Sequence, residues 1–119
     1  MKKNVVKEKS FAFALQIVRL AEFLRNEKHE YVLSKQVLRS GTAIGALVRE
    51  AEHAESKADF IHKMSISLKE ANETEYWIEL LYQAHYLNLQ QYNSIRPKIG
   101  DLNRLLITII RTSKERGGK

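Results

Sequence analysis

Two carboxylates, Glu70 and Glu73, share one face of a predicted helix with Trp77, the only tryptophan in the chain. Ile66 and Leu80 continue this face at spacings of three or four residues, which is the repeat of an α-helix. Two neighbouring carboxylates are the residue types of a general acid–base pair or of a metal site. An unpaired buried carboxylate costs several kcal/mol, so each of these interpretations requires a partner for both groups.

Metal binding and catalysis both lack the further residues that they need. Di-iron four-helix bundles carry two Glu-x-x-His motifs, whereas this chain has one, from Glu50 to His53. Cysteine is absent, which removes thiolate ligands and thiol nucleophiles. No serine or aspartate is obviously arranged for nucleophilic catalysis with a histidine of the chain, that is, with His29, His53, His62 or His85. The sequence therefore predicts no metal, no cofactor and no enzymatic activity.

A structural role is the stronger interpretation of the carboxylates. Three bases are candidates to pair with Glu50, Glu70 and Glu73, namely Arg39, Arg49 and Lys69. Buried ion pairs stabilise a protein weakly, but they can specify which surfaces dock and in which register. We expect a polar network that fixes helix pairing or subunit contact.

The composition is typical of one helical domain. The chain has 119 residues, 44% of them hydrophobic, with one proline and five glycines. All-β domains of this size usually contain more turn residues, so helices are favoured. No apolar run is long enough to span a membrane, and charged residues interrupt the apolar stretch that follows the basic start, unlike in a signal peptide. We expect a soluble cytoplasmic protein.

Four amphipathic segments alternate with short polar connections. Their periodicity predicts helices over about residues 10–26, 32–54, 57–86 and 89–113. Ser10 is the predicted N-cap of the first helix, and Ser56 with Asp59 forms a capping box at the start of the third. Pro97 predicts a kink or a late start in the fourth. The expected fold is all-α, a single-domain antiparallel up-down-up-down four-helix bundle with basic tails at both ends.

Gly41 and Gly45 lie one turn apart in the second predicted helix. Each costs about 1 kcal/mol relative to alanine in a helix interior, so the pair requires a reason. A phosphate-binding loop would need a preceding strand and a different glycine spacing. We therefore expect close packing of another helix against both glycines.

The net charge of +6 is unevenly distributed. Segment 50–79 holds eight acids and three bases, a local charge of −5, which leaves +11 for the remainder. Basic ends on an acidic middle indicate a polyanionic partner or a self-complementary assembly, although solvated terminal lysines are an equally open alternative. The bases predicted to contact nucleic acid are Lys7, Lys9, Arg19, Arg25, Arg104, Arg111, Lys114 and Arg116.

Four motifs occur in order along the chain: R-S-G-T-A-I-G at 39–45, E-A at 50–51, S-K-A-D-F at 56–60 and K-E-A-N-E-T-E-Y-W at 69–77. Together they resemble the 23S ribosomal RNA intervening-sequence protein family of small four-helix bundles, over about residues 11–111. The resemblance implies an antiparallel bundle that assembles as a homopentamer. The related accessory variability determinant of diversity-generating retroelements is basic and binds nucleic acid and its reverse transcriptase.

The family's motif positions fall on residues that we expect to form the structural or interface network. These are Arg39, Ser40, Glu50, Asp59, Lys63, Lys69, Glu70, Glu73, Thr74 and Trp77. The chain departs from the motif at Ala43 and Leu47, where the family has serine and asparagine. We expect a non-enzymatic homo-oligomer, a pentamer, that acts as a nucleic-acid-binding or accessory module. Its expected partners are RNA or DNA and a protein such as a reverse transcriptase. The alternative is an interaction scaffold for a protein encoded nearby, without a nucleic-acid role.

Overall fold

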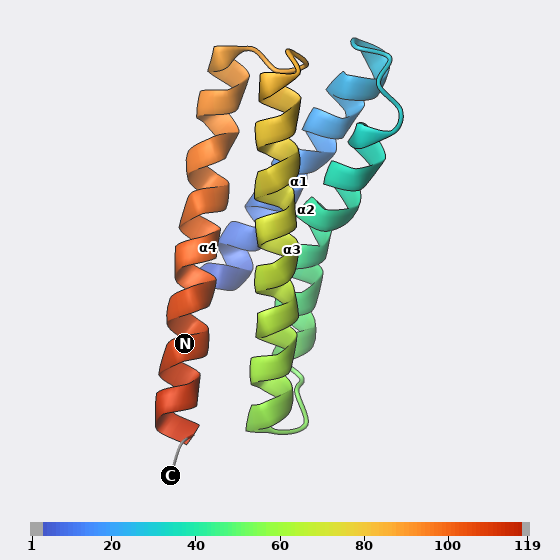
Figure 1. The fold of residues 1–119 in the computed structure, drawn as a ribbon. Helices are drawn as coiled ribbons and strands as arrows, with labels where there is room; N and C mark the ends of the chain where they lie inside the picture. The colour runs from blue at the N-terminus through green and yellow to red at the C-terminus, as the bar shows by residue number, and fades with distance from the viewer. Residues whose placement is uncertain (1–3, 118–119) are drawn as a thin grey trace.

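Four long helices make up the computed structural model, which describes residues 4–117. In chain order they are α1 (Val5–Asn26), α2 (Leu33–Ala51), α3 (Lys57–Gln83) and α4 (Leu89–Gly117). The connections alternate between the two ends of the molecule, so successive helices run antiparallel (Figure 1). Within residues 4–117 there is no strand. The predicted all-α up-down-up-down four-helix bundle is confirmed.

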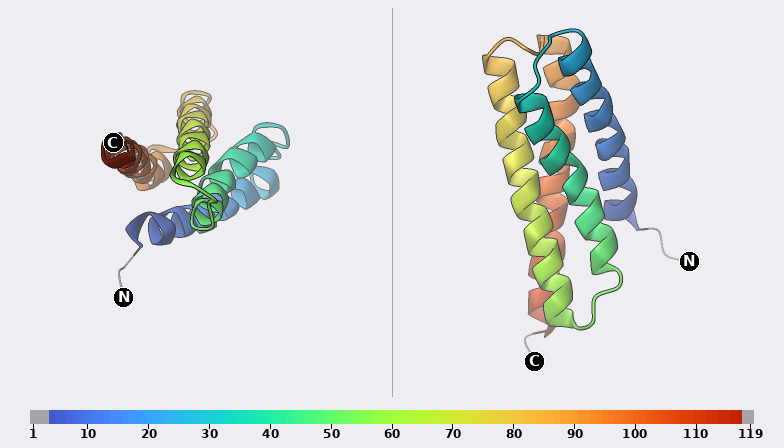
Figure 2. Two further views of the ribbon diagram at one scale, coloured as in Figure 1. Left: turned by 90° about the horizontal axis from the view of Figure 1, so that it is seen from below. Right: turned by 90° about the vertical axis from the view of Figure 1, so that its right-hand side faces the viewer.

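α3 lies between α2 and α4, and α1 crosses behind them (Figure 1). The axis of α1 is inclined to those of α3 and α4, as the end-on view shows (Figure 2). α1 packs against α2 along its length, from the pair of Lys7 with Glu52 onward, and it lies beside α4 over its first half. The molecule is elongated, with extents of 51 × 26 × 21 Å.

All four helices contribute to one apolar core. Its largest fully buried side chains include Phe13 and Ile17 from α1, Ile44 from α2, Ile78 from α3 and Leu106 from α4. On α3 the buried face is the one that carries Met64, Ser67, Ala71, Thr74, Ile78 and Leu81. The face with Glu70, Glu73 and Trp77 is only half-buried, because it lies at the edge of the α2–α3 contact. Within residues 4–117, no helix has a stretch long and apolar enough to cross a bilayer.

α1 begins earlier than the sequence predicted. The side chain of Asn4 accepts a hydrogen bond from the backbone N–H of Lys7 at 3.0 Å, which makes Asn4 the N-cap and Val5 the first helical residue. The prediction of Ser10 as N-cap is wrong: Ser10 is buried inside the helix, and its hydroxyl donates to the carbonyl of Lys7. Asparagine caps a helix at least as well as serine, and Asn4 comes first in the chain.

Capping side chains also start α3 and α4. Ser56 Oγ accepts from the backbone N–H of Asp59 at 3.0 Å, which confirms Ser56 as the N-cap of α3. The carboxylate of Asp59 accepts from the N–H of Glu55 rather than from that of Ser56. Before α4, Asn88 and Gln91 exchange two such bonds at 2.8 Å each, which is a reciprocal capping box.

Left-handed histidines follow α1 and α3 at the same end of the bundle. His29 has φ 54° and His85 has φ 69°. The N–H of Tyr86 donates to the carbonyl of Leu81 at 2.9 Å, the bond of a Schellman motif. Because the left-handed residue reverses the chain direction, α3 ends at Gln83 rather than at residue 86.

The other two helices also differ from their expected bounds. α2 runs from Leu33 to Ala51, and a turn replaces its last predicted residues. α4 runs without interruption from Leu89, its expected first residue, to Gly117, four residues beyond its expected end, so the alternative of a late start at Pro97 is wrong. Pro97 leaves one carbonyl on the preceding turn without a helical donor, but it lies on the exposed side of α4, where water can hydrate that group.

The two glycines of α2 lie against α1. A Cβ atom added to Gly41 would lie 2.8 Å from Ile17 Cγ1, which is closer than side chains pack. A Cβ atom on Gly45 would lie 3.4 Å from the carbonyl carbon of Ser10. The expectation that the glycines permit close helix packing is therefore confirmed.

Candidate functional site

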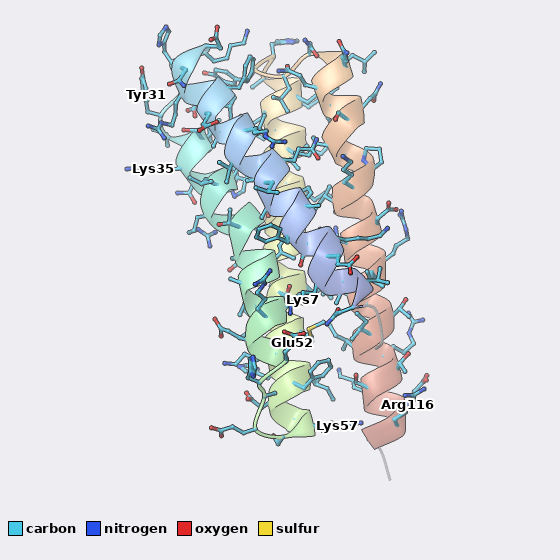
Figure 3. All side chains as sticks on the ribbon, turned by 180° about the vertical axis from the view of Figure 1, so that it is seen from behind. Lys7, Tyr31, Lys35, Glu52, Lys57 and Arg116 are labelled. Atoms are coloured by element: carbon cyan, nitrogen blue, oxygen red, sulfur yellow. The ribbon has the colours of Figure 1, made fainter. Side chains whose placement is uncertain are left out.

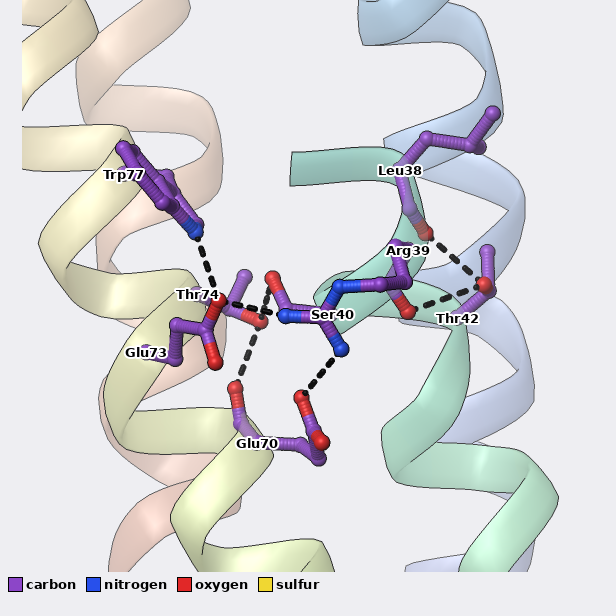
Figure 4. Close-up of polar contacts among 8 residues, drawn as sticks. All are labelled: Leu38, Arg39, Ser40, Thr42, Glu70, Glu73, Thr74 and Trp77. Atoms are coloured by element: carbon purple, nitrogen blue, oxygen red, sulfur yellow. Dashed lines mark hydrogen bonds and ion pairs between the residues drawn. The ribbon is translucent and has the colours of Figure 1, made fainter. Parts of the chain in front are cut away.

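A cluster of polar side chains joins α2 to α3 (Figure 4). Arg39 on α2 reaches across the contact, with Nη1 3.1 Å from Glu70 Oε1 and Nη2 hydrogen-bonded to Glu73 Oε2. The indole Nε1 of Trp77 donates to the same oxygen of Glu73 at 3.1 Å. One guanidinium therefore pairs with two carboxylates that lie about one turn apart on α3.

Electrostatics in this cluster favour the ionised form of Glu73. The hydrogen bond from Arg39, followed by that from Trp77, holds the pKa of the Glu73 carboxyl below its usual value. The hydrogen bond to Glu73 also raises the pKa of Arg39. The Arg39 and Glu73 side chains are 51% and 38% exposed, so water screens the attraction and limits its strength. A general acid at neutral pH needs a raised pKa, and Glu73 has the opposite shift.

Two buried hydroxyls lie beneath the ion pairs. Thr74 Oγ1 is 2.8 Å from Ser40 Oγ and 2.7 Å from the carbonyl oxygen of Glu70. Two turns earlier on α3, Ser67 donates to the carbonyl of Ile44 on α2 at 3.0 Å. Because buried polar groups need partners, these bonds favour one register of α2 against α3. We call Arg39, Ser40, Glu70, Glu73, Thr74 and Trp77 the α2–α3 polar seam.

The remaining motif positions lie outside the polar seam. Glu50 pairs with Lys63 at 3.3 Å nearer the start of α3, and Asp59 takes part in capping that helix. Lys69 is exposed and forms no ion pair within residues 4–117. The expected pairing of Arg49 with an acid does not occur, since its guanidinium lies over the ring of Phe11, 5.2 Å from the centroid. Phe11 on α1 is therefore the partner of this guanidinium.

A second polar group, between α3 and α4, was absent from the sequence-based predictions. Arg96 pairs with Glu75 and Glu79, and Asn103 Nδ2 donates to Glu75 at 2.8 Å. The hydroxyl of Tyr92 donates to Glu79, which raises the pKa of Tyr92. In the sequence, the spacing of Glu75 and Glu79 places them one turn apart on the third helix, which indicates a site for a base. The sequence alone does not show that Arg96 faces them.

The eight predicted nucleic-acid-binding bases lie on α1 and α4, but they do not form one surface. Lys7 pairs with Glu52 at 3.1 Å and lowers the pKa of that carboxyl, and Arg104 pairs with Asp101 (Figure 3). The other six form no ion pair within residues 4–117 and are exposed: Lys9, Arg19, Arg25, Arg111, Lys114 and Arg116. The last three occupy the final two turns of α4, whereas Arg25 lies towards the opposite end of the molecule.

Within residues 4–117, no three histidine or acidic side chains gather in a way that could hold a metal ion. The Glu50–His53 motif is divided, because Glu50 pairs with Lys63 and His53 lies exposed in the turn after α2. The polar seam can orient helices, and its exposed edge can contact another molecule.

Comparisons with known proteins agree on the family. A crystal structure of a protein with unknown function from the S23 ribosomal protein family of Bacteroides thetaiotaomicron is 59% identical to this chain, with a TM-score of 0.87. The match covers 88% of this chain and 97% of that chain. A comparison with curated proteins gives no match. The model of the family described as 23S rRNA-intervening sequence protein matches residues 2–108. The resemblance carried by the motifs is confirmed, and the chain belongs to the 23S rRNA-intervening sequence protein family.

Proposed function

We propose that this protein is a non-enzymatic, homo-oligomeric helical bundle that binds RNA or DNA as an accessory module. The observation that carries the proposal is the charge of α4, which has six basic and two acidic residues, a net charge of +4. The adjacent helix α3 has three basic and five acidic residues, a net charge of −2. A helix with this excess of positive charge attracts a polyphosphate backbone.

Half of the bases of α4 lie in its final two turns. Arg111, Lys114 and Arg116 are exposed, and Glu115 is the one acid among them. These turns extend beyond the start of α1, which leaves them open on that side (Figure 3). Bases in a last turn also offset the helix dipole, but that effect does not account for Arg111, which lies further back.

Seven of the fourteen acids form ion pairs within residues 4–117, and none of these pairs involves a base at the end of α4. Arg39, Lys63 and Arg96 neutralise carboxylates on α2 and α3. Arg111, Lys114 and Arg116 at the end of α4 form no ion pair within residues 4–117, and Glu115 is the one acid among them. Each contact between such a base and a phosphate releases a condensed counterion, which makes affinity dependent on salt.

An exposed apolar stripe on α1 supports self-association. Phe11, Leu15 and Val18 are 52%, 45% and 39% exposed, and their spacing places them on one face of the helix. Contiguous exposed apolar side chains mark interaction surfaces. The homopentamer implied by the family resemblance would bring five copies of α4 into one assembly and so multiply the contacts with one nucleic acid.

The experiment measures binding of labelled single-stranded RNA and duplex DNA over a salt series. The triple variant R111A/K114A/R116A is compared with K35A/K57A/K69A, which removes the same charge from exposed positions on α2 and α3. We expect the first variant to bind at least tenfold more weakly than the unmodified protein. A plot of its log affinity against log salt concentration should be less steep than that of the unmodified protein, by about 2 to 3 in slope. Absence of binding by the unmodified protein at low salt, or equal losses in both variants, would refute the proposal.

A further inference from the structure

A groove runs between the first half of α1 and the middle of α4. It consists of two adjoining hollows of about 270 Å³ and 380 Å³, which share Lys9 and Asp101 as lining residues. Above them, Gln16 on α1 donates to Ser94 on α4 at 3.1 Å and closes the contact. Below them, α1 begins at Val5 while α4 continues, so the groove is open at its lower end (Figure 3).

The floor of this groove is apolar. In the upper hollow it is formed by Ala12 and by the edges of the core residues Phe13 and Leu102. In the lower hollow it is formed by Val5, which is 44% exposed, and by Leu105, which is half-buried. Such a floor is stabilised by an apolar side chain that excludes water from it. A phosphodiester backbone has no apolar side chain that could cover this floor.

The rim of the groove is basic. Lys9 on α1 and Lys98 on α4 are exposed, and neither forms an ion pair within residues 4–117. Arg104 lies further down the same rim and pairs with Asp101 of its own helix. Three bases and one acid give the groove a net charge of +2. An occupant that complements it has carboxylates at its edges.

The length of the groove suits a short helix. Its lining residues run from Val5 to Phe13 on α1 and from Lys98 to Thr108 on α4. At 1.5 Å per residue these spans are about 12 to 15 Å, or two to three turns of a partner helix. Helix-in-groove recognition places an apolar face on the floor and polar side chains along the rim.

We propose that this groove docks an amphipathic helix of another protein, with apolar side chains against Val5 and Leu105 and carboxylates paired to Lys9 and Lys98. The acidic helix α3 of a second copy is a poorer match, because its carboxylates are engaged already. Arg39 pairs with two of them and Arg96 with two more, and the fifth takes part in the cap of α3.

The probes are two synthetic helix-forming peptides of about four turns with the same leucine stripe. One carries glutamate at the flanking positions, and the other carries lysine there. Anisotropy of the labelled peptides is measured on the full chain at low salt. We expect the glutamate peptide to bind at least tenfold more tightly than the lysine peptide. The variant K9E/K98E should reverse that order, Leu105→Ala should weaken both peptides severalfold, and K35E/K57E should change neither.

Several outcomes would overturn the proposal. Failure of the glutamate peptide to bind, or binding that K9E/K98E leaves unchanged, excludes an acidic helix. An oligonucleotide is then added to the bound peptide. If it displaces the peptide from the unmodified protein but not from R111A/K114A/R116A, the nucleic acid lies at the end of α4 and repels an acidic peptide in the groove, which supports the proposal. If it displaces the peptide equally from both proteins, the groove itself binds nucleic acid. A fall in molecular mass of K9E/K98E by light scattering assigns it to a second copy. The nucleic-acid proposal has a separate test, because R111A/K114A/R116A changes no residue that lines the groove.

Discussion

The indole of Trp77 donates to the carboxylate of Glu73 at 3.1 Å, on the oxygen that also accepts from Arg39. This shared acceptor links a residue of α2 to two residues one turn apart on α3. It gives Glu73 two donors that favour its charged form. The carboxylate therefore orients helices through fixed hydrogen bonds.

The first prediction concerns the dependence of stability on pH. The pKa of Glu73 is lowered in the folded protein, so its contribution to stability is present at neutral pH. That contribution is lost as the pH falls below about 4.3, the ordinary pKa of glutamate in an unfolded chain, and then through the lower pKa of Glu73 in the folded protein. We expect Glu73→Gln to lower the free energy of unfolding by about 0.5 kcal/mol at pH 7, because the pair is partly exposed.

The measurement is denaturant unfolding of the unmodified protein and of Glu73→Gln at pH 7 and at successively lower pH. The difference between the two proteins should shrink as pH falls below 4.3. A difference that persists or grows on acidification would contradict the assignment. Glutamine retains an oxygen that can accept from Trp77, so the comparison isolates the charge.

The second prediction concerns the contact between Gly41 and Ile17. A methyl group on Gly41 would meet Ile17 Cγ1 at 2.8 Å, so Gly41→Ala should destabilise the bundle by about 1 to 3 kcal/mol. The matched control is Gly100→Ala, where the nearest atoms are the flexible ends of Arg96 and Arg104. There the gain in helix propensity should stabilise by up to about 1 kcal/mol. The measurement is the melting temperature of each variant. Gly41→Ala should lower it and Gly100→Ala should raise it, and changes of the same sign would refute the prediction.

The third prediction concerns the left-handed residue that follows α3. His85 has φ 69°, a conformation that costs most residues with a Cβ about 1 to 2 kcal/mol. His85→Gly should therefore raise the melting temperature by several degrees. His62 is an exposed histidine inside α3, and His62→Gly should lower the stability by about 0.5 kcal/mol. Loss of stability in His85→Gly would show that its side chain makes a contact that outweighs the strain.

The fourth prediction concerns the apolar stripe of α1. Phe11→Ser combined with Leu15→Ser replaces two exposed apolar side chains, so it should leave the monomer's helical content unchanged. If the stripe mediates assembly, the mass by light scattering should fall towards the 13.8 kDa of one chain. Leu89→Ser is the control, because Leu89 is 58% exposed but lies on α4. An unchanged mass for the α1 variant would exclude this stripe as the interface.

Much of the fold follows from local sequence signals. The periodic apolar positions predicted four helices, and Ser56 marked the start of α3 correctly because an N-cap acts within four residues. The errors lie where a local signal was ambiguous. Asn4 took the capping role assigned to Ser10, and His85 adopted the left-handed conformation that glycine usually supplies.

The sequence by itself determined the helical periodicity, the family motifs and the excess of positive charge outside segment 50–79, because each depends on residue type and spacing along the chain. Only the tertiary structure decided which bases meet which acids. Arg39 reaches Glu70 and Glu73, whereas Arg49 lies over Phe11. These contacts, and the groove between α1 and α4, depend on the rotation and crossing angle of whole helices, which are set by packing of the shared core.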